Sequence, residues 1–377
     1  MMRQMQELLE WLIDGVPGVR SPLDVADRIG RDLAAEGVPL LRLGVFVRTL
    51  HPNVLGRAFI WERGKPSRVA ELTPQVSASR DFLHSPVTWV YEHRAEWRWR
   101  AGEPDQGYGV LRDLGQKGCV DYVAMPLSFS NGEVHVVTYA TDVGFTDEHV
   151  GAFRRLAPPL ARVAEIFALR RVATTLLETY LGKVSGGRVM AGQIQRGDVE
   201  TIRAAIWFSD LRGFTAMSSR RSPKQMIETL NRVFECQVPA IEKRGGEVLK
   251  FIGDGLLAIF PIADDARARC TAALEGAREA FTAVEQLADD EPLHIGLALH
   301  VGDVEYGNIG GPSRLDFTAI GSAVNLAARL EGVASKTGRP LVMSAEFAQA
   351  SGRPCEDLGA FELKGIATPQ HVFAPLD

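Results

Sequence analysis

Two apolar stretches, each interrupted by one carboxylate at a turn, constrain this chain most tightly. Residues 206–215 read IWFSDLRGFT, so a β-type apolar run ends at Asp210 and Gly213 follows it closely. Residues 250–260 read KFIGDGLLAIF, in which Asp254 stands between two glycines and between two apolar runs. Such a pattern is typical of a β-hairpin. Both carboxylates are therefore expected at the ends of strands.

If the two strands are neighbours, the two carboxylates converge at one edge of a sheet. Two convergent carboxylates beside a glycine-rich turn favour a hard divalent cation such as Mg²⁺ together with a polyphosphate. The sequence therefore predicts a metal site made of Asp210 and Asp254. Either motif alone would be weak support, because a D-x-x-G turn is usually an ordinary turn.

A third motif makes the pattern specific. Residues 318–331 read TAIGSAVNLAARLE, and together with FSDLRGFT (208–215) and KFIGDG (250–255) they resemble the catalytic domain of class III adenylyl/guanylyl cyclases. The resemblance covers about residues 195–377. It implies an enzyme that converts ATP to 3′,5′-cyclic AMP and pyrophosphate, through attack of the ribose 3′-hydroxyl on the α-phosphate.

The resemblance assigns roles to the two acids and to the turn behind them. Asp210 and Asp254 match the family's metal-binding pair, which implies two Mg²⁺ or Mn²⁺ ions per site. These ions would activate the 3′-hydroxyl and neutralise the departing pyrophosphate. The backbone amides at Gly213 and Phe214 could bind phosphate oxygens, as turn amides do. Arg212, in the same turn, is interpreted as a surface charge.

Five further positions match catalytic and substrate-binding residues of the family. Asn325 and Arg329 are four residues apart and so share one helix face. The resemblance makes this pair catalytic, orienting the ribose and stabilising negative charge on the α-phosphate. Lys250 and Thr318 match the base-reading positions, and Lys364 matches a lysine that contacts the triphosphate.

The base-reading pair favours ATP. Lys250 can donate to N1 of adenine, whereas guanine carries a donor at that position and would leave the lysine unpaired. Thr318 replaces the aspartate of many family members and resembles a bacterial and soluble-type subclass; its hydroxyl can accept from adenine N6. A guanylyl cyclase remains an alternative, as does a catalytically inactive nucleotide-binding regulatory protein. A diguanylate cyclase fits poorly, because 245–248 (GGEV) follows that family's hairpin motif only in part.

The family shares its active site between two subunits. The resemblance implies that Asp210 and Asp254 of one chain act with the other five positions of a second chain, which gives a homodimer two equivalent sites. Residues 303–316, which include several glycines, are predicted to form the arm that reaches the partner.

Apolar periodicity predicts the elements of residues 199–377, the expected catalytic domain. Strands are predicted at 203–209, 246–252, 256–260 and 293–301, and helices at 223–243, 264–288 and 322–336. Ser222–Pro223 is typical of a helix start. The resulting β-α-β-β-α-β order predicts an α+β sandwich of the ferredoxin-like type.

Residues 1–150 show a different order of elements. Two amphipathic helices are predicted within 1–36, strands at 41–47, 57–61, 122–127 and 134–140, an Asn131–Gly132 hairpin turn, and a helix that opens with FTDE at 145–148. The final strand, N-G turn, strand and FTDE resemble a GAF domain, a small-molecule sensor fold. Residues 80–112 are predicted to be irregular, and their aromatic side chains could wall a ligand pocket or simply pack in the core.

Residues 151–198 are expected to be a signalling helix and a transducer linker. One apolar seam comprises Phe153, Leu156, Leu160, Val163 and Phe167, and a second comprises Ile166, Leu169, Ala173, Leu176 and Tyr180. Pro158–Pro159 are predicted to break or kink the start of the helix. The remaining helix favours a parallel coiled coil between protomers, with packing on its own sensor domain as the alternative. Residues 182–198 are predicted to be flexible.

Composition limits the kinds of partner that we expect for this protein and the cellular compartment in which we expect it. The net charge of −5, from 42 basic and 47 acidic residues, gives no general attraction to nucleic acid or to an anionic membrane. No apolar run approaches the roughly 20 residues of a membrane span. The four cysteines are far apart, as in a reduced cytoplasmic protein. We therefore expect a cytoplasmic enzyme without nucleic-acid or membrane partners.

Overall fold

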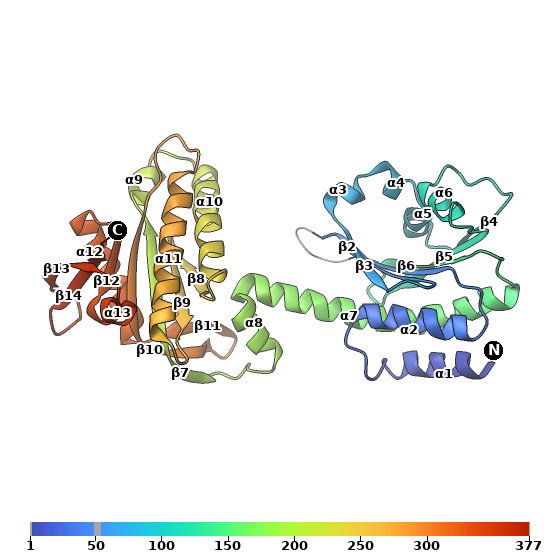
Figure 1. The fold of residues 1–377 in the computed structure, drawn as a ribbon, viewed down its shortest axis with the longest axis horizontal. Helices are drawn as coiled ribbons and strands as arrows, with labels where there is room; N and C mark the ends of the chain where they lie inside the picture. Colours follow the sequence, from blue (N-terminus) through green and yellow to red (C-terminus); the bar gives the residue numbers. More distant parts are fainter. Residues whose placement is uncertain (1, 49–53, 377) are drawn as a thin grey trace. The chain divides into compact units, whose positions relative to one another are not determined.

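In a computed structural model, which describes residues 2–48 and 54–376, the chain forms two compact units, residues 1–175 and 176–377. Each unit has its own β-sheet and its own buried apolar core (Figure 1). Both units mix helices with strands, which confirms the predicted α+β class. Throughout the described ranges, every helix is too short or too polar to cross a membrane.

Unit 1 is built on a sheet whose described strands run in the order β3-β2-β1-β6-β5-β4, with each neighbouring pair antiparallel. The strands are β1 (Arg42–Arg48), β2 (Gly56–Glu62), β3 (Arg68–Leu72), β4 (Trp97–Arg100), β5 (Asp121–Ser128) and β6 (Val134–Thr141). Helices α1 (Met2–Ile13), α2 (Pro22–Ala35) and α7 (Asp147–Leu181) cover one face of the sheet. The other face carries α3 (Pro74–Ser77), α4 (Arg80–Leu83), α5 (Pro86–His93) and α6 (Gly109–Gly115) (Figure 1).

Local sequence signals explain where these elements begin and end. Ser21 and Asp24 form a capping box at the start of α2, in which each side chain accepts a backbone N–H of the other. Ile29, on the inner face of this helix, is completely buried in the core shared with the sheet. The predicted Asn131–Gly132 turn joins β5 to β6, which pair from Ser128 and Val134 onward. The early helices and this hairpin are therefore confirmed.

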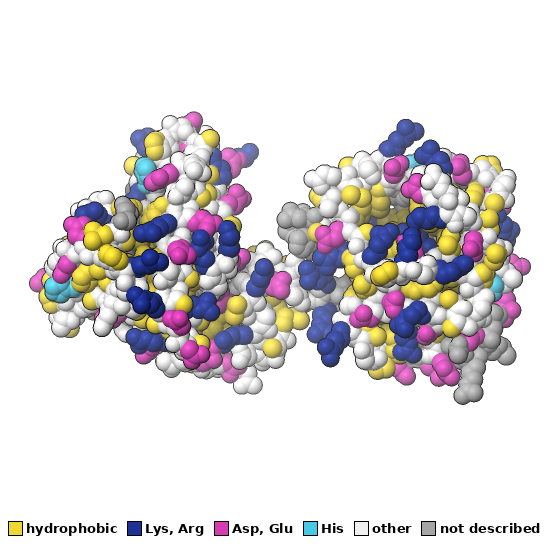
Figure 2. Space-filling model, in the orientation of Figure 1, with side chains coloured by type: hydrophobic (Ala, Val, Ile, Leu, Met, Phe, Trp, Pro, Cys, Tyr) yellow, Lys and Arg dark blue, Asp and Glu magenta, His cyan; other side chains and the backbone are white. Residues whose placement is uncertain are grey.

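Residues 80–112 are more regular than predicted. They contain α4, α5, β4 and the start of α6, and the side chains of Trp97 and Tyr108 are buried in the core on this face of the sheet. The short apolar faces of these elements pack on one another, which a mixed run of aromatic and charged residues does not reveal. Phe82 and Tyr91 line a cavity of about 700 Å³, and Figure 2 shows unit 1 hollowed on this side of the sheet.

Helix α7 continues through Pro158–Pro159, so the predicted break is wrong. The two prolines leave the carbonyls of Arg154 and Arg155 without helical partners. Both arginines are exposed, so water can reach those carbonyls. Leu156 is completely buried in the core of unit 1. Apolar burial on one side and hydration on the other together keep the helix continuous.

The two apolar seams of α7 differ in their packing. Most of the first seam lies in the core of unit 1 and Phe167 packs against it, so the alternative prediction of packing on its own domain holds there. In the second seam, Ile166, Leu169, Leu176 and Tyr180 are all exposed. Only this second seam stays as a predicted surface for a partner helix.

Unit 2, within residues 176–376, is built on a sheet in the order β13-β14-β12-β10-β7-β9-β8, with β11 paired to β10. The strands are β7 (Val199–Leu211), β8 (Glu247–Ile252), β9 (Gly255–Pro261), β10 (Ile295–Gly311), β11 (Arg314–Ile320), β12 (Leu341–Ser344), β13 (Cys355–Phe361) and β14 (Gln370–Pro375). The helices are α8 (Lys183–Met190), α9 (Phe214–Ser218), α10 (Pro223–Glu242), α11 (Ala266–Glu285), α12 (Ser322–Thr337) and α13 (Ala345–Ser351).

The centre of unit 2 follows the predicted β-α-β-β-α-β pattern. Strands β10, β7, β9 and β8 are neighbours in that order and all pair antiparallel, which is the ferredoxin-like arrangement. Helix α10 begins with a capping box of Ser222 and Gln225, as its Ser-Pro start predicts. Residues 303–316, the predicted arm, span the second half of β10 and the start of β11, which pair as a hairpin.

Residues 182–198 are not uniformly flexible, because α8 is anchored to the sheet of unit 2. The backbone N–H and the hydroxyl of Ser185 donate to one oxygen of Glu247, at 2.9 and 2.5 Å, and the Tyr306 hydroxyl donates to the other, at 2.6 Å. All three residues are buried. A buried carboxylate is tolerated when its oxygens are hydrogen-bonded in this way.

Candidate active site

Asp210 and Asp254 meet at one end of the unit 2 sheet because β7 and β9 are neighbouring strands. Ser209 pairs with Leu256, which sets Asp210 beside the turn that precedes β9. Gly255 permits this close approach, since a Cβ there would lie 2.8 Å from the carbonyl oxygen of Ser209. The two carboxyl groups lie close enough to interact. The structure thus brings these two predicted residues together.

The contact between the acids changes the protonation of Asp210. Burial, the hydrogen bond with Asp254 and the negative charges of Asp254 and Glu331 raise the pKa of Asp210 to about 7. Near neutral pH the carboxyl group of Asp210 is therefore close to the midpoint of its titration. A divalent cation between the two carboxyl groups would remove the same repulsion.

Arg212, interpreted from the sequence as a surface charge, is only partly exposed and contacts a third acid. Its guanidinium lies 2.9 Å from Glu331 of α12, and its side chain is only 27% exposed. It crosses Gly296 of β10, where a Cβ would lie 1.9 Å from the guanidinium. Burial raises the pKa of Glu331, and the charge of Arg212 opposes that rise. Arg212 thus balances the charge of a carboxylate next to the aspartate pair.

The donor atoms at this site suit a hard cation that also binds substrate. Across the described ranges, no cluster of three or more His, Cys, Asp and Glu side chains is arranged to hold a metal ion. Asp210 and Asp254 can therefore supply only part of a ligand shell. Backbone carbonyls, water and phosphate oxygens would have to complete it, as is usual for Mg²⁺ at nucleotide sites.

The turn after Asp210 leads directly into a short helix. Gly213 is exposed and has a φ of +72°, a left-handed conformation that glycine adopts without steric cost. Phe214 begins α9 and packs partly against the core of unit 2. Because the first N–H groups of a helix have no partner within it, the amides at these two positions can serve a ligand a few residues beyond Asp210.

Lys250 and Thr318 lie near each other because Asp316 contacts Lys250 and lies on the same strand as Thr318. The Lys250 ammonium donates to Asp316 of β11. Asp316 and Thr318 are two residues apart on the same strand and therefore face the same side. Thr318 is only 3% exposed, and its hydroxyl has no hydrogen-bond partner in the described part of the chain. A buried hydroxyl without a partner is costly, so a ligand could usefully supply one.

Asn325 and Arg329 do not approach the aspartate pair of their own chain. Both are exposed on α12, and neither side chain pairs with another described residue. Arg329 and Glu331 are two positions apart, which is about 200° around a helix. Because Glu331 faces the aspartates, Arg329 points the opposite way. Lys364 is exposed in the segment between β13 and β14.

Two residues at this site escaped the sequence analysis, although both lie in the third motif or just before it. Asp316 precedes Thr318 by two positions, so the period of a strand could have placed it beside the base-reading pair. Glu331 follows Ala327 by four positions and so falls on the buried face of α12. An acid on an apolar helix face was the available signal for Glu331.

Residues 199–373 match the family described as "Adenylate and Guanylate cyclase catalytic domain". This segment is a class III cyclase catalytic domain. The cyclase domain accounts for the three motifs and for most of unit 2. The match does not extend to unit 1, so the GAF-like character of residues 1–150 stays a prediction.

Named relatives match the cyclase domain at modest identity. An adenylate cyclase of Anabaena cylindrica is 35% identical over 155 residues, which are 38% of this chain and 30% of that protein. Adenylate cyclase 1 of Rhizobium meliloti is 30% identical over 177 residues, 45% of this chain and 26% of that protein. The chain thus spans less than a third of the length of each relative. The solved adenylyl cyclase CyaB from P. aeruginosa shares 26% identity over 48% of this chain and 96% of that chain, with a TM-score of 0.44.

Proposed function

We propose that this chain is an adenylyl cyclase that forms cyclic AMP and pyrophosphate from ATP. The observation that carries the proposal is the contact of Asp210 with Asp254, in which the pKa of a partly buried carboxyl rises to about 7. Two carboxylates held against each other repel, which is unfavourable unless a bound positive charge offsets the repulsion. Divalent cations that also bind a triphosphate would offset it.

Asp210 and Asp254 would hold two Mg²⁺ or Mn²⁺ ions, in keeping with their oxygen-only donor set. Bound there, the ions would lower the pKa of the ribose 3′-hydroxyl and offset the charge of pyrophosphate. The protein's own part is positioning: Gly255 brings the two strands close together, and Arg212 neutralises the adjacent Glu331. The amides at Gly213 and Phe214 would bind phosphate oxygens.

The base would be selected by Lys250 and Thr318. Asp316 holds the ammonium of Lys250 at the base position, and Lys250 would donate to adenine N1. The unpartnered hydroxyl of Thr318 would accept from adenine N6. Guanine presents an N1–H donor where adenine presents an acceptor, so the contact between Lys250 and N1 would be lost; this favours ATP and makes guanylyl cyclase the second candidate activity.

The site would be shared by two chains of a homodimer. The geometry of α12 supports this, because Arg329 faces away from the side on which Glu331 approaches Asp254. Asn325 and Arg329 of one chain would therefore act on a nucleotide held by the aspartates of its partner, together with Lys250, Thr318 and Lys364 of that same chain. The always-charged guanidinium of Arg329 suits the role of stabilising the α-phosphate in the transition state.

The roles of the remaining parts of the chain are proposed from the role of the catalytic domain. We take residues 1–150 as a GAF-like sensor domain, residues 151–198 as a signalling helix and transducer, and residues 199–377 as the catalytic domain. The continuity of α7 from unit 1 into unit 2 supports a role in transmission. Comparing the cyclase rate of the full chain with that of residues 183–377 would reveal whether the front of the chain regulates and in which direction.

The proposal is tested by identifying the product. Purified protein is incubated with Mn²⁺ and either ATP or GTP, and the products are separated by chromatography. Cyclic AMP should exceed cyclic GMP by about tenfold or more, the discrimination expected of one mismatched buried hydrogen bond. The variant Asp254→Asn should lose activity by at least about a hundredfold while its folding is unchanged. No cyclic nucleotide from either substrate would leave only the inactive nucleotide-binding reading, and mainly cyclic GMP would reverse the base assignment.

A further inference from the structure

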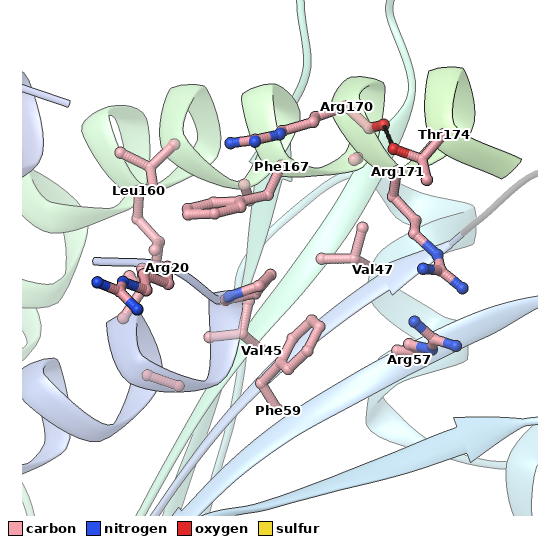
Figure 3. A pocket seen from close by; sticks show the side chains of 16 residues that line it. Arg20, Val45, Val47, Arg57, Phe59, Leu160, Phe167, Arg170, Arg171 and Thr174 are labelled. Atoms are coloured by element: carbon pink, nitrogen blue, oxygen red, sulfur yellow. Dashed lines mark hydrogen bonds between the residues drawn. The ribbon is translucent and has the colours of Figure 1, made fainter. Parts of the chain in front are cut away.

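A second cavity of unit 1, of about 390 Å³, lies on the face of the sheet that carries α2 and α7. Its walls come from strands β1 and β2 below and from helix α7 above (Figure 3). The larger cavity opens on the α3–α6 side, where the aromatic side chains of residues 80–112 could wall a ligand pocket or simply pack in the core, and Ala168 of α7 lines both cavities. The smaller cavity therefore needs its own explanation.

The middle of this cavity is apolar. Side chains from the sheet and from α7 face each other across it, among them Val45, Val47, Phe59, Leu160 and Phe167. Phe59 is 9% exposed and Phe167 is only partly buried. The cavity therefore reaches the core of unit 1, but the core side chains do not fill it. Such a lining favours a hydrocarbon chain over a polar ligand.

The rim carries charge of one sign. Arg20, Arg57, Arg170 and Arg171 line the cavity, and no acidic side chain lines it. Among the described residues, Arg20, Arg170 and Arg171 form no ion pair, whereas Arg57 pairs with Glu71 at 2.9 Å. Several guanidinium groups beside an apolar cleft attract a negative group, and they bind a carboxylate or phosphate in a bidentate way.

Arg57 and Arg171 define the end at which that negative group would sit. Figure 3 shows the side chain of Arg171 reaching from α7 towards Arg57 on β2, with Arg20 at the opposite end of the cavity. The Nε atom of Arg57 is buried and has no hydrogen-bond partner in the described part of the chain. Two like charges and an unused buried donor are unfavourable together, and an anion between the two arginines would satisfy both.

We propose that this cavity binds a single-chain amphipathic anion, with its carboxylate or phosphate head between Arg57 and Arg171 and its hydrocarbon tail along Phe59 and Phe167. The proposal concerns unit 1 alone and is independent of the reaction proposed for unit 2. Because Phe167 and Arg171 belong to α7, the ligand would contact the helix that continues into the cyclase unit. A ligand that prefers one conformation of α7 would shift the population towards it.

The test is calorimetric titration of the full chain with decanoate and, separately, decyl phosphate, each below its micelle-forming concentration. Decanol provides the tail without the charge, and acetate the charge without the tail. One of the two anions should bind saturably at one per chain, and the stronger of them identifies the head group. Decanol and acetate should each bind at least about tenfold more weakly, because each lacks one of the two contributions.

Variants locate the head group. Arg57→Gln together with Arg171→Gln should weaken the binding by about tenfold or more, since two charge-assisted contacts are lost. Arg155→Gln removes one charge from an exposed position of α7 outside the cavity and should leave affinity within about twofold. Arg20→Gln, at the other end, should have a smaller effect than the double variant. Circular dichroism and thermal unfolding check that each variant is folded.

Four results would overturn the proposal. The first is the absence of saturable binding of either anion to the unaltered chain. The second is equal affinity for decanol or for acetate, which would remove the need for both an apolar wall and a charged rim. The third is an equal loss of affinity in Arg155→Gln and in the double variant, which would mean that binding depends only on the net charge of the protein. The variant Ala164→Trp, which fills the cavity from α7, should also abolish binding, and retained affinity there would place the ligand elsewhere.

Discussion

At position 210, a half-buried carboxyl group is held against a second carboxyl, which favours a proton or a cation at Asp210. The main chain creates this situation, because the pairing of Ser209 with Leu256 fixes where the turn at Asp254 lies. Both acids were predictable, since each stands at a glycine-marked turn between apolar runs. Asp316 and Glu331 were not predicted, because their partners depend on strand register and on helix rotation that the motifs do not state.

The first prediction concerns pH and stability without metal. The pKa of Asp210 rises from 3.8 to about 7 on folding, so the folded state holds a proton that the unfolded chain releases. Stability attributable to Asp210 is therefore present below about pH 4 and is lost as pH rises through about 7. In EDTA, Asp210→Asn should raise the melting temperature more at about pH 8 than at about pH 5. An equal change at both values would contradict the pKa assignment.

The second prediction concerns base choice. Lys250→Gln removes the charge that Asp316 holds beside Thr318, so the preference for ATP over GTP should fall by about tenfold. The readout is the ratio of kcat/KM for the two nucleotides in the same preparation. Lys243→Gln, which removes an exposed lysine from the end of α10, is the matched control. A ratio that falls equally in both variants would assign the preference to general charge instead of base contact.

At the scale of the elements, apolar periodicity located the central strands and helices of unit 2 and the helices that open unit 1. It failed at segments whose structure depends on tertiary packing. The predicted break at Pro158–Pro159 is absent because Leu156 is buried on one side while water reaches the other. The predicted flexible segment contains α8 because buried Glu247 requires hydrogen bonds from Ser185 and Tyr306. Neither partner is close to Glu247 in sequence.

The third prediction tests the corner between α7 and α8. A Cβ at Gly186 would lie 2.8 Å from the backbone carbonyl carbon of Leu177, whereas a Cβ at Gly187 would meet nothing within 4 Å. Gly186→Ala should therefore destabilise unit 2 by about 1–3 kcal/mol and change the cyclase rate. Gly187→Ala should be neutral or stabilise by up to about 1 kcal/mol. Urea unfolding measures both, and equal effects would mean that the corner does not limit packing.

At the scale of the whole molecule, one chain carries a complete set of proposed catalytic residues but keeps them apart. Asn325 and Arg329 are exposed, and α12 turns them away from the side that faces the aspartates. The motifs alone name the proposed residues, yet their separation follows only from how α12 packs on the sheet. The exposed second seam of α7 offers a surface along which two chains could associate.

The most direct measurement is complementation between two inactive variants. Asp210→Asn lacks the metal-binding set and Arg329→Ala lacks the catalytic set, so each homodimer should be nearly inactive. Mixed under conditions of proven subunit exchange, the chains should form heterodimers with one intact site, and the mixture should recover up to about a quarter of the unaltered activity. No recovery despite exchange would contradict the shared site and require all the residues to act within one chain.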